Sequence, residues 1–264
     1  MEQLRAYLEG RFKEIPGWCH PQLFQTIQPL DQLQRRHGVE GPVCEIGVLK
    51  GKFFIALMKL KQARPHYAID LFSLERRDFD QGGRGHLNKF RTNIKRNGGN
   101  LDDVRILERD SMEITRRDID RILDDTDGGF SMFSIDGAHT AEHTIHDART
   151  AMALTRPGGI IFVDDYYNAN WPGVQEGVCR LYFIDSPPFV PLLETCNKLV
   201  LCHRSYHAEY LDYVGDFVTR HFPDSRVKQV KRFGFDNLTI TVNQETGAAL
   251  APEDDEPATA EAAA

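Results

Sequence analysis

The chain has 264 residues, of which 41% are hydrophobic and 27% charged, and its formal net charge is −7. This composition is typical of a globular protein and excludes collagen-like, coiled-coil and wholly disordered classes. No apolar run is long enough for a membrane-spanning helix. The N-terminal residues contain no apolar segment of the secretory type, so we expect a cytoplasmic protein.

The negative charge is concentrated near the C-terminus. Residues 247–264 hold five acidic residues and no basic residue, and the rest of the chain is nearly neutral. We therefore expect no bulk attraction to nucleic acid or to anionic membranes. Residues 246–264 are rich in Ala, Pro and acid and cannot bury much apolar surface, which predicts a disordered acidic tail.

The cysteines give no framework for the fold. There are five, at positions 19, 44, 179, 196 and 202, and none forms a C-x-x-C pair. The odd number and wide spacing argue against a disulfide scaffold and against a zinc–thiolate site. A reducing cytoplasm fits this usage best.

Helical patterning covers residues 1–40, and short apolar runs then alternate with amphipathic stretches. The runs are rich in Val, Ile and Phe, which is typical of strands covered on both faces. The alternation indicates βαβ units around a parallel sheet. The predicted strands are residues 42–46, 66–70, 104–108, 130–136, 159–164, 199–203 and 238–242.

The last part of this region departs from that rhythm. A helix is predicted over 212–221, and the runs 226–232 and 235–242 then suggest an antiparallel closing hairpin. We therefore predict an α/β fold over residues 41–245, with a Rossmann-like, doubly wound and mostly parallel seven-stranded sheet. The charged, glycine-rich segment Ser73 to Gly85 is either a surface loop or a lid over a ligand.

A glycine turn follows the first predicted strand. Gly47 and Gly51 flank Val48-Leu49-Lys50 before a helix, and such a turn lets a ligand approach the backbone closely. The spacing is not the G-x-G-x-x-G dinucleotide fingerprint, and no G-K-[ST] phosphate loop follows.

The next two predicted strands end in matching polar residues. Asp70 closes the second strand and could accept hydrogen bonds from both hydroxyls of a ribose. Asp110 and Ser111 follow the third strand, where short polar side chains can reach an adenine edge. Together with the glycine turn, these residues predict an adenosine-type pocket.

The pattern resembles the S-adenosylmethionine site of class I methyltransferases, over roughly residues 43–242. The resemblance implies that Glu45 and Gly47 face the methionine end, Asp70 the ribose, and Asp110 with Ser111 the adenine. Gly51 and Asp136 complete the implied cofactor set. The alternative is that Glu45 pairs locally and that Asp70 is a solvated loop acid.

Three acids follow the fourth and fifth predicted strands. Asp136 ends one, and Asp164 with Asp165 ends the other. Parallel strands present their carboxyl ends at one sheet edge, where such carboxylates would repel one another unless a cation neutralised them. Oxygen ligation suits Mg²⁺, with Mn²⁺ or Ca²⁺ as substitutes. Alternatively, these acids line the cofactor pocket and bind no metal.

The spacing of these acids resembles that of metal-dependent sugar and natural-product O-methyltransferases, including those acting on macrolide sugars, some of whose relatives are cephalosporin hydroxylase-like. The matching residues are Asp136, His139, Asp164 and Asp165. The resemblance implies three metal ligands, Asp136, Asp164 and Asp165, and a catalytic base, His139. His139 could instead be a capping or solvated residue at a helix start.

Several neighbouring residues have competing interpretations. A zinc site of His139, His143 and His146 is disfavoured, because the helix phase turns the last two toward solvent. Tyr166, Tyr167 and Trp171 could line an acceptor site or lie in the core, and Pro16-Gly17-Trp18 could cover the substrate or contact another subunit.

These features predict a Mg²⁺-dependent O-methyltransferase that moves a methyl group from S-adenosylmethionine to a hydroxyl of a small natural product, either a sugar or a catechol-like compound. The alternative is a non-catalytic S-adenosylmethionine-binding partner in a biosynthetic pathway. An NAD-dependent enzyme is disfavoured by the missing dinucleotide fingerprint. A homo-oligomer is possible, and no nucleic-acid or membrane partner is expected.

Overall fold

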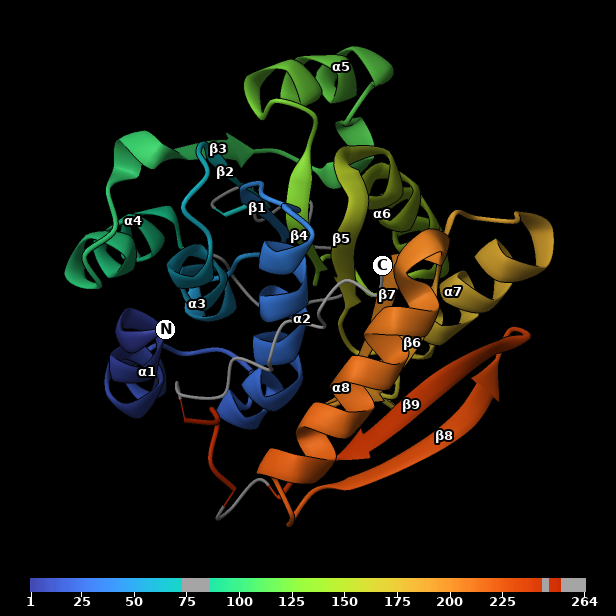
Figure 1. Cartoon of the computed structure of the whole chain (residues 1–264). Coiled ribbons are helices and arrows are strands. Elements are labelled where there is room, and N and C mark those ends of the chain that lie inside the picture. Colours follow the sequence, from blue (N-terminus) through green and yellow to red (C-terminus); the bar gives the residue numbers. More distant parts are fainter. Residues whose placement is uncertain (73–85, 244–246, 253–264) are drawn as a thin grey trace, which may run out of the picture.

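The computed structural model describes residues 1–72, 86–243 and 247–252 (Figure 1). The whole of the predicted lid, Ser73 to Gly85, therefore lies outside the described residues, as do residues 246 and 253–264 of the predicted tail. Within the described part, no helix is both long and apolar enough to cross a membrane.

One nine-stranded sheet organises the chain, in the order β3-β2-β1-β4-β5-β7-β6-β9-β8. Strands β1 to β5 pair in parallel, whereas β5 with β7, β6 with β7, and β8 with β9 are antiparallel. The strands are β1 Val43–Ile46, β2 His66–Asp70, β3 Val104–Glu108, β4 Phe130–Ile135, β5 Thr155–Val163, β6 Phe189–Thr195, β7 Lys198–His203, β8 Arg226–Arg232 and β9 Phe235–Thr241. The predicted fold class and closing hairpin are confirmed, but seven strands was too few.

Helices cover both faces of the sheet (Figure 1). The α-helices are α1 Glu2–Glu9, α2 Phe24–Arg36, α3 Lys52–Leu60, α4 Leu87–Arg96, α5 Arg116–Asp125, α6 Ala141–Leu154, α7 Pro172–Ile184 and α8 His207–His221. Short 3₁₀ helices are η1 Arg11–Glu14, η2 Pro21–Leu23, η4 Leu101–Asp103, η5 Ser111–Glu113 and η6 Arg204–Tyr206.

Two hydrophobic cores lie on opposite faces of the sheet. Successive strand residues point to opposite faces, and in β5 Phe162 joins the core under α1 to α4 and α8, whereas Ile161 joins the core under α5 to α7. Because both faces are covered, the central strands are almost continuously apolar. This explains why the sequence shows apolar runs in place of alternation.

Strand β6 was missed because Pro187 and Pro188 precede it and Pro191 lies within it, and prolines are typical of loops. Pro191 lies within the strand, where a missing N–H normally breaks the ladder. The pairing of β6 with β7 shifts register between Pro191 and Leu193, so the proline sits at an irregularity that tolerates it. The result is a β6–β7 hairpin that the sequence prediction lacked.

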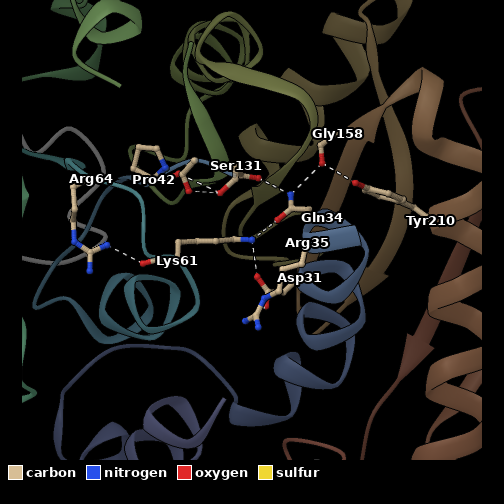
Figure 2. Close-up of polar contacts among 10 residues, drawn as sticks. Asp31, Gln34, Arg35, Pro42, Lys61, Arg64, Ser131, Gly158 and Tyr210 are labelled. Carbon is tan, nitrogen blue, oxygen red and sulfur yellow. Dashed lines mark hydrogen bonds and ion pairs between the residues drawn. The ribbon is translucent and has the colours of Figure 1, made fainter. Parts of the chain in front are cut away.

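A buried polar network ties α2 to the sheet edge formed by the N-terminal ends of the parallel strands. Figure 2 shows Lys61 reaching Asp31 Oδ1 at 2.6 Å and Gln34 Oε1 at 2.7 Å. Gln34 Nε2 donates to the carbonyls of Ser131 and Gly158 at 2.8 and 3.1 Å. The helical segment 1–40 is thereby part of the same packed unit as the sheet.

The beginning of the predicted tail is ordered. Ala251 N donates to Gln28 Oε1 at 2.8 Å, and Gln25 Nε2 donates to the carbonyl of Ala248 at 2.6 Å. Leu250 and Ala251 are buried against the core. The prediction of disorder from residue 246 onward is therefore wrong for residues 247–251, because Leu250 and Ala251 pack in the core and the backbone there hydrogen-bonds to α2.

Candidate functional site

A cavity of about 770 Å³ opens at the carboxyl ends of the parallel strands. Its walls come from the segments that follow β1 to β5, from residues 17–23, and from the β6–β7 turn. Five predicted cofactor residues line it: Gly47, Asp70, Asp110, Ser111 and Asp136. Glu45 and Gly51, also predicted, are not among the lining residues.

Gly47 lies where the segment after β1 passes very close to the backbone of Asp136. It has φ of +84°, and a Cβ placed there would lie 1.7 Å from the carbonyl oxygen of Asp136. No other residue fits this contact, because side chains are excluded from both that conformation and that space. The turn therefore brings the ends of β1 and β4 together at the cavity floor.

Glu45 lies behind this floor and not in the cavity. The side chain is buried, and its pKa is raised well above the ordinary value by burial first and by Asp136 second, while Lys198 opposes the shift. Glu45 therefore interacts electrostatically with Asp136 and Lys198 but does not line the cavity.

Asp70 ends β2 facing the turn. Its Oδ2 accepts from Leu49 N at 2.8 Å, and its Oδ1 accepts from Phe72 N at 2.6 Å. Burial raises the pKa of Asp70 to about 6, although these backbone N–H groups act in the opposite direction. The carboxylate is thus fixed in orientation on the cavity wall.

Asp110 and Ser111 lie in a turn held by α6. Asp110 Oδ1 accepts from Met112 N at 3.0 Å, and His146 Nε2 donates to the carbonyl of Ser111 at 2.9 Å. His143 lines the cavity, with Nε2 3.9 Å from Asp110 Oδ1. The prediction that His143 and His146 face solvent is wrong, because the turn after β3 covers that side of α6.

Asp136, which follows β4, lies close to His139 and to Asp165. Ligand atoms of Asp136, His139 and Asp165 all lie within 4.8 Å of one another. His139 Nε2 is 3.0 Å from Asp165 Oδ2 and 3.9 Å from Asp136 Oδ1. Among the described residues, this is the group of acidic, histidine or cysteine side chains that could hold a metal ion.

Two side-chain amides fix the carboxylate of Asp165. Asn168 Nδ2 and Asn197 Nδ2 donate to its Oδ1 at 2.8 and 2.6 Å. Burial alone would raise the pKa of Asp165, but the hydrogen bonds with His139 and Asn168 lower it overall. The residue has φ of +56°, a left-handed conformation that turns its carboxylate toward His139.

Asp164 does not join the cluster, contrary to the prediction of three carboxylate ligands. It forms a buried ion pair with Lys198, and its Oδ1 accepts from Asp165 N at 2.9 Å. Burial would lower the pKa of Lys198, but Asp164 and Asp136 raise it, so the ammonium group stays charged. The negative charge of Asp164 is therefore already balanced by the protein.

Lys198 and Asn197 were not predicted as site residues. They enter through the β6–β7 turn, where Cys196 and Asn197 have φ of +46° and +70°. Two consecutive positive φ values are typical of the two-residue hairpin turns in which Asn is favoured. The Asn between two apolar runs was the signal for this turn, but the prolines before it concealed the first strand.

Aromatic side chains contribute unequally to the cavity. Trp171 lines it and stacks on His139, with ring centroids 4.4 Å apart and planes 16° apart. Trp18 also lines it and is 83% exposed, while Lys52 Nζ donates to the carbonyl of Gly17 at 3.0 Å. Tyr166 and Tyr167 are not among the lining residues, so that part of the predicted aromatic wall is absent.

A family profile described as "Methyltransferase domain" matches residues 44–166. A search of curated proteins finds no match. Among solved structures, the chain is similar to the O-methyltransferase NovP, with a TM-score of 0.50 and 16% identity over 69% of this chain and 79% of that chain.

Two further solved structures are more distant. CalS11, a TDP-rhamnose 3′-O-methyltransferase of calicheamicin biosynthesis, gives a TM-score of 0.45 and 16% identity over 76% of this chain and 93% of that chain. MycE of the mycinamycin pathway, solved with Mg and SAH, gives 0.41 and 17% over 62% of this chain and 44% of that chain.

Proposed function

We propose that this chain is a class I methyltransferase that moves a methyl group from S-adenosylmethionine to a hydroxyl of a small-molecule natural product, which the profile match over residues 44–166 and the fold shared with NovP support. The observation that carries the proposal is that one cavity is lined both by the predicted nucleoside-binding residues and by the Asp136–His139–Asp165 cluster. The methyl donor and an oxygen-binding cluster would then share one space.

The nucleoside part is supported by geometry on three strand ends. Gly47 leaves the backbone open to close approach, and Asp70 presents a carboxylate that two ribose hydroxyls could share. Asp110 and Ser111 lie on the same cavity wall for the adenine edge. We therefore propose S-adenosylmethionine as the methyl donor, and these residues with Asp136 as its contacts.

The cluster fits a divalent cation, for which we propose Mg²⁺, with Mn²⁺ or Ca²⁺ as substitutes. Two carboxylates and one imidazole lie within ligand reach of a common point, and Asp165 is held by amide donors as metal-binding carboxylates commonly are. Such a cation lowers the pKa of a bound hydroxyl. We propose Asp136, His139 and Asp165 as its ligands, with Asp164 kept from direct contact by Lys198.

His139 has two possible roles that use the same Nε2 atom. As a base it would take the acceptor proton at Nε2, and the N–H so formed would donate to Asp165 Oδ2, which lies 3.0 Å away. As a ligand it would complete the cluster. The stacked Trp171 fixes the ring plane in both cases.

The acceptor class follows from the cluster. A sugar diol or a catechol offers two adjacent oxygens to the site, and Trp18 and Trp171 offer apolar ring surface beside it. The protein then contributes mainly orientation, by holding the acceptor oxygen in line with the sulfonium methyl group.

Calorimetry and a methyl-transfer assay with sugar and catechol acceptors test this function. We expect S-adenosylhomocysteine to bind with or without Mg²⁺, and we expect EDTA to abolish turnover until Mg²⁺ or Mn²⁺ is restored. Asp165→Asn should lower turnover roughly 100-fold while sparing cofactor affinity. The matched surface change Asp185→Asn should leave both unchanged.

Other outcomes assign the roles differently. Full turnover in EDTA would refute the cation, and cofactor binding without transfer to any acceptor would favour the non-catalytic partner. For His139→Ala, loss of Mn²⁺ affinity identifies a ligand, whereas unchanged Mn²⁺ affinity with lost turnover identifies a base.

A further inference from the structure

Trp18 is an exposed aromatic residue on the wall of the cavity. Its side chain is 83% exposed, and it is one of the lining residues. In the described part of the chain, the other large hydrophobic residues that are strongly exposed do not line the cavity; they are Met112, Tyr167, Phe183 and Ile184. Single exposed hydrophobic side chains are common on protein surfaces, but an exposed indole at a ligand site indicates a contact that the ligand completes.

The backbone on both sides of Trp18 is fixed. Lys52 Nζ donates to the carbonyl of Gly17 at 3.0 Å, and a Cβ built on Gly17 would lie 3.4 Å from the Cβ of Lys52. The Lys52 carbonyl in turn accepts from the Tyr7 hydroxyl at 2.9 Å. After Trp18, Leu23 is fully buried in the core. The indole is therefore presented by an ordered segment, which leaves little conformational freedom to lose when a ligand binds.

The contacts of Gly17 place this segment beside the turn that follows β1. A Cβ built on Gly17 would lie 3.8 Å from Leu49 Cδ2. In the sheet, β4 is adjacent to β1, whereas β3 lies two strands away from β1, or about 10 Å at the usual spacing. Asp136 of the cluster follows β4, and Asp110 of the proposed adenine wall follows β3. The strand order therefore puts the Trp18 segment nearer to the cluster, where the acceptor would bind, than to the adenine end.

The family profile separates Trp18 from the cofactor residues in the same way. The profile matches residues 44–166, which include all the residues that we propose as contacts of the methyl donor. Trp18 lies outside this range. Substrate preference is set by particular residues added to a shared fold, so an aromatic residue outside the shared part fits a contact with the acceptor.

We propose that Trp18 is a specificity-determining residue that stacks on the ring of the acceptor, so that the site prefers a diol carried on a ring to an acyclic diol. The inference rests on the proposed methyl transfer and adds the shape of its acceptor. A catechol ring and the C–H face of a pyranose both offer an apolar surface to an indole, and such stacking strengthens binding by roughly tenfold. A contact with the ring, and not with the reacting oxygen, lowers KM and leaves kcat unchanged.

The kinetic test uses three acceptors with S-adenosylmethionine and Mg²⁺: catechol, methyl mannopyranoside and the acyclic diol ethylene glycol. Trp18→Ala should raise KM for the ring-bearing acceptors roughly tenfold, with kcat and S-adenosylhomocysteine affinity unchanged. It should not alter the response to ethylene glycol. The matched control is Phe183→Ala, because Phe183 is 82% exposed but does not line the cavity, and it should change none of these quantities.

A binding test needs no turnover. The chain has two tryptophans, so Trp171→Phe leaves Trp18 as the single indole and keeps an aromatic ring beside His139. With S-adenosylhomocysteine and Mg²⁺ present, a ring-bearing acceptor should shift the Trp18 emission to the blue and protect it from acrylamide quenching. Ethylene glycol should do neither. A larger effect with catechol assigns an aromatic acceptor, and a larger effect with the pyranoside assigns a sugar.

Unchanged KM for both ring-bearing acceptors in Trp18→Ala overturns the inference and leaves the proposed function standing. A loss of S-adenosylhomocysteine affinity in that variant would place the indole on the cofactor, and a blue shift that follows protein concentration would place it between two copies of the chain. Either result also overturns the inference.

The failure of the proposed function gives a different result. If S-adenosylhomocysteine binds but no acceptor is methylated, the Trp18 emission decides, and the absence of a shift with both ring-bearing acceptors overturns the inference. If the wild-type protein neither binds S-adenosylhomocysteine nor methylates any acceptor, the proposed function fails and the inference falls with it.

Discussion

The Asp70 carboxylate shows how one residue balances burial against hydrogen bonding. Burial raises its pKa to about 6, while N–H groups of Phe72 and Leu49 pull the pKa down. Only the ionised carboxylate has acceptor capacity to spare for both hydroxyls of a ribose. The charge state of this residue should therefore govern nucleoside affinity.

We predict that S-adenosylhomocysteine affinity is constant from pH 8 to pH 7 and falls as the pH drops through 6. If binding requires the ionised form, the loss approaches about tenfold per pH unit below the pKa. Calorimetry between pH 5 and pH 8 measures this. Asp70→Asn should bind more weakly and should lack this pH dependence, whereas undiminished wild-type affinity at pH 5 would contradict the assignment.

Residues at the ends of parallel strands were predictable, and those delivered by the hairpin were not. Asp70 and Asp136 follow apolar runs directly, so strand order alone brings them to one edge. Lys198 arrives from an antiparallel strand far along the chain, opposite a strand disguised by Pro191. No sequence pattern near Asp164 predicts that Lys198 forms an ion pair with it.

At the scale of the element, the alternation of side chains between the two faces of β5 explains why Asp164 and Asp165 have different partners. Phe162 packs on one face and Val163, the last residue of β5, on the other, and Asp164 follows directly, with its N–H donating to the carbonyl of Ile135 at 2.9 Å. The Lys198 ammonium that pairs with Asp164 lies 4.9 Å from the Phe53 ring, on the face of Phe162. The left-handed Asp165 turns instead toward His139.

Variants of Asn197 in the β6–β7 turn can separate the effect of its left-handed backbone conformation from that of its hydrogen bond to Asp165. Asn197→Ala places a side chain without αL preference at φ of +70° and removes the amide from Asp165, so stability should fall by about 1–2 kcal/mol and Mn²⁺ affinity by roughly tenfold. Urea unfolding and calorimetry measure the two effects.

Asn197→Gly is the matched control, since glycine accepts the same backbone angle without supplying the amide. Stability should return most of the way to that of the wild type, and Mn²⁺ affinity should stay low. Recovery of both quantities in the glycine variant would mean that Asn197 serves the turn alone.

At the scale of the whole molecule, the network around Lys61 joins elements that are distant in sequence. Asp31 and Gln34 lie in α2, and Gln34 Nε2 donates to the carbonyl of Gly158 in β5 (Figure 2). Tyr210 of α8 donates to the same carbonyl at 2.9 Å. This network lies at the opposite edge of the sheet from the cavity.

Lys61→Met should lower the free energy of unfolding by about 3 kcal/mol, because Asp31 would keep a buried charge with only the half-exposed Arg35 beside it. Urea unfolding monitored by circular dichroism measures the loss. The exposed change Lys13→Met should cost less than about 0.5 kcal/mol. Equal stability of both variants would show that the ion pair contributes nothing net.

The contacts between α2 and residues 247–251 also determine when this part of the chain can finish folding during its synthesis. Gln25 and Gln28 emerge from the ribosome early. The groups they hydrogen-bond, the carbonyl of Ala248 and the N–H of Ala251, are synthesised more than 200 residues later. At ordinary translation speeds that interval is on the order of ten seconds or more. During it, one side of α2 stays open to water and to chaperones, and it closes only when the late segment arrives.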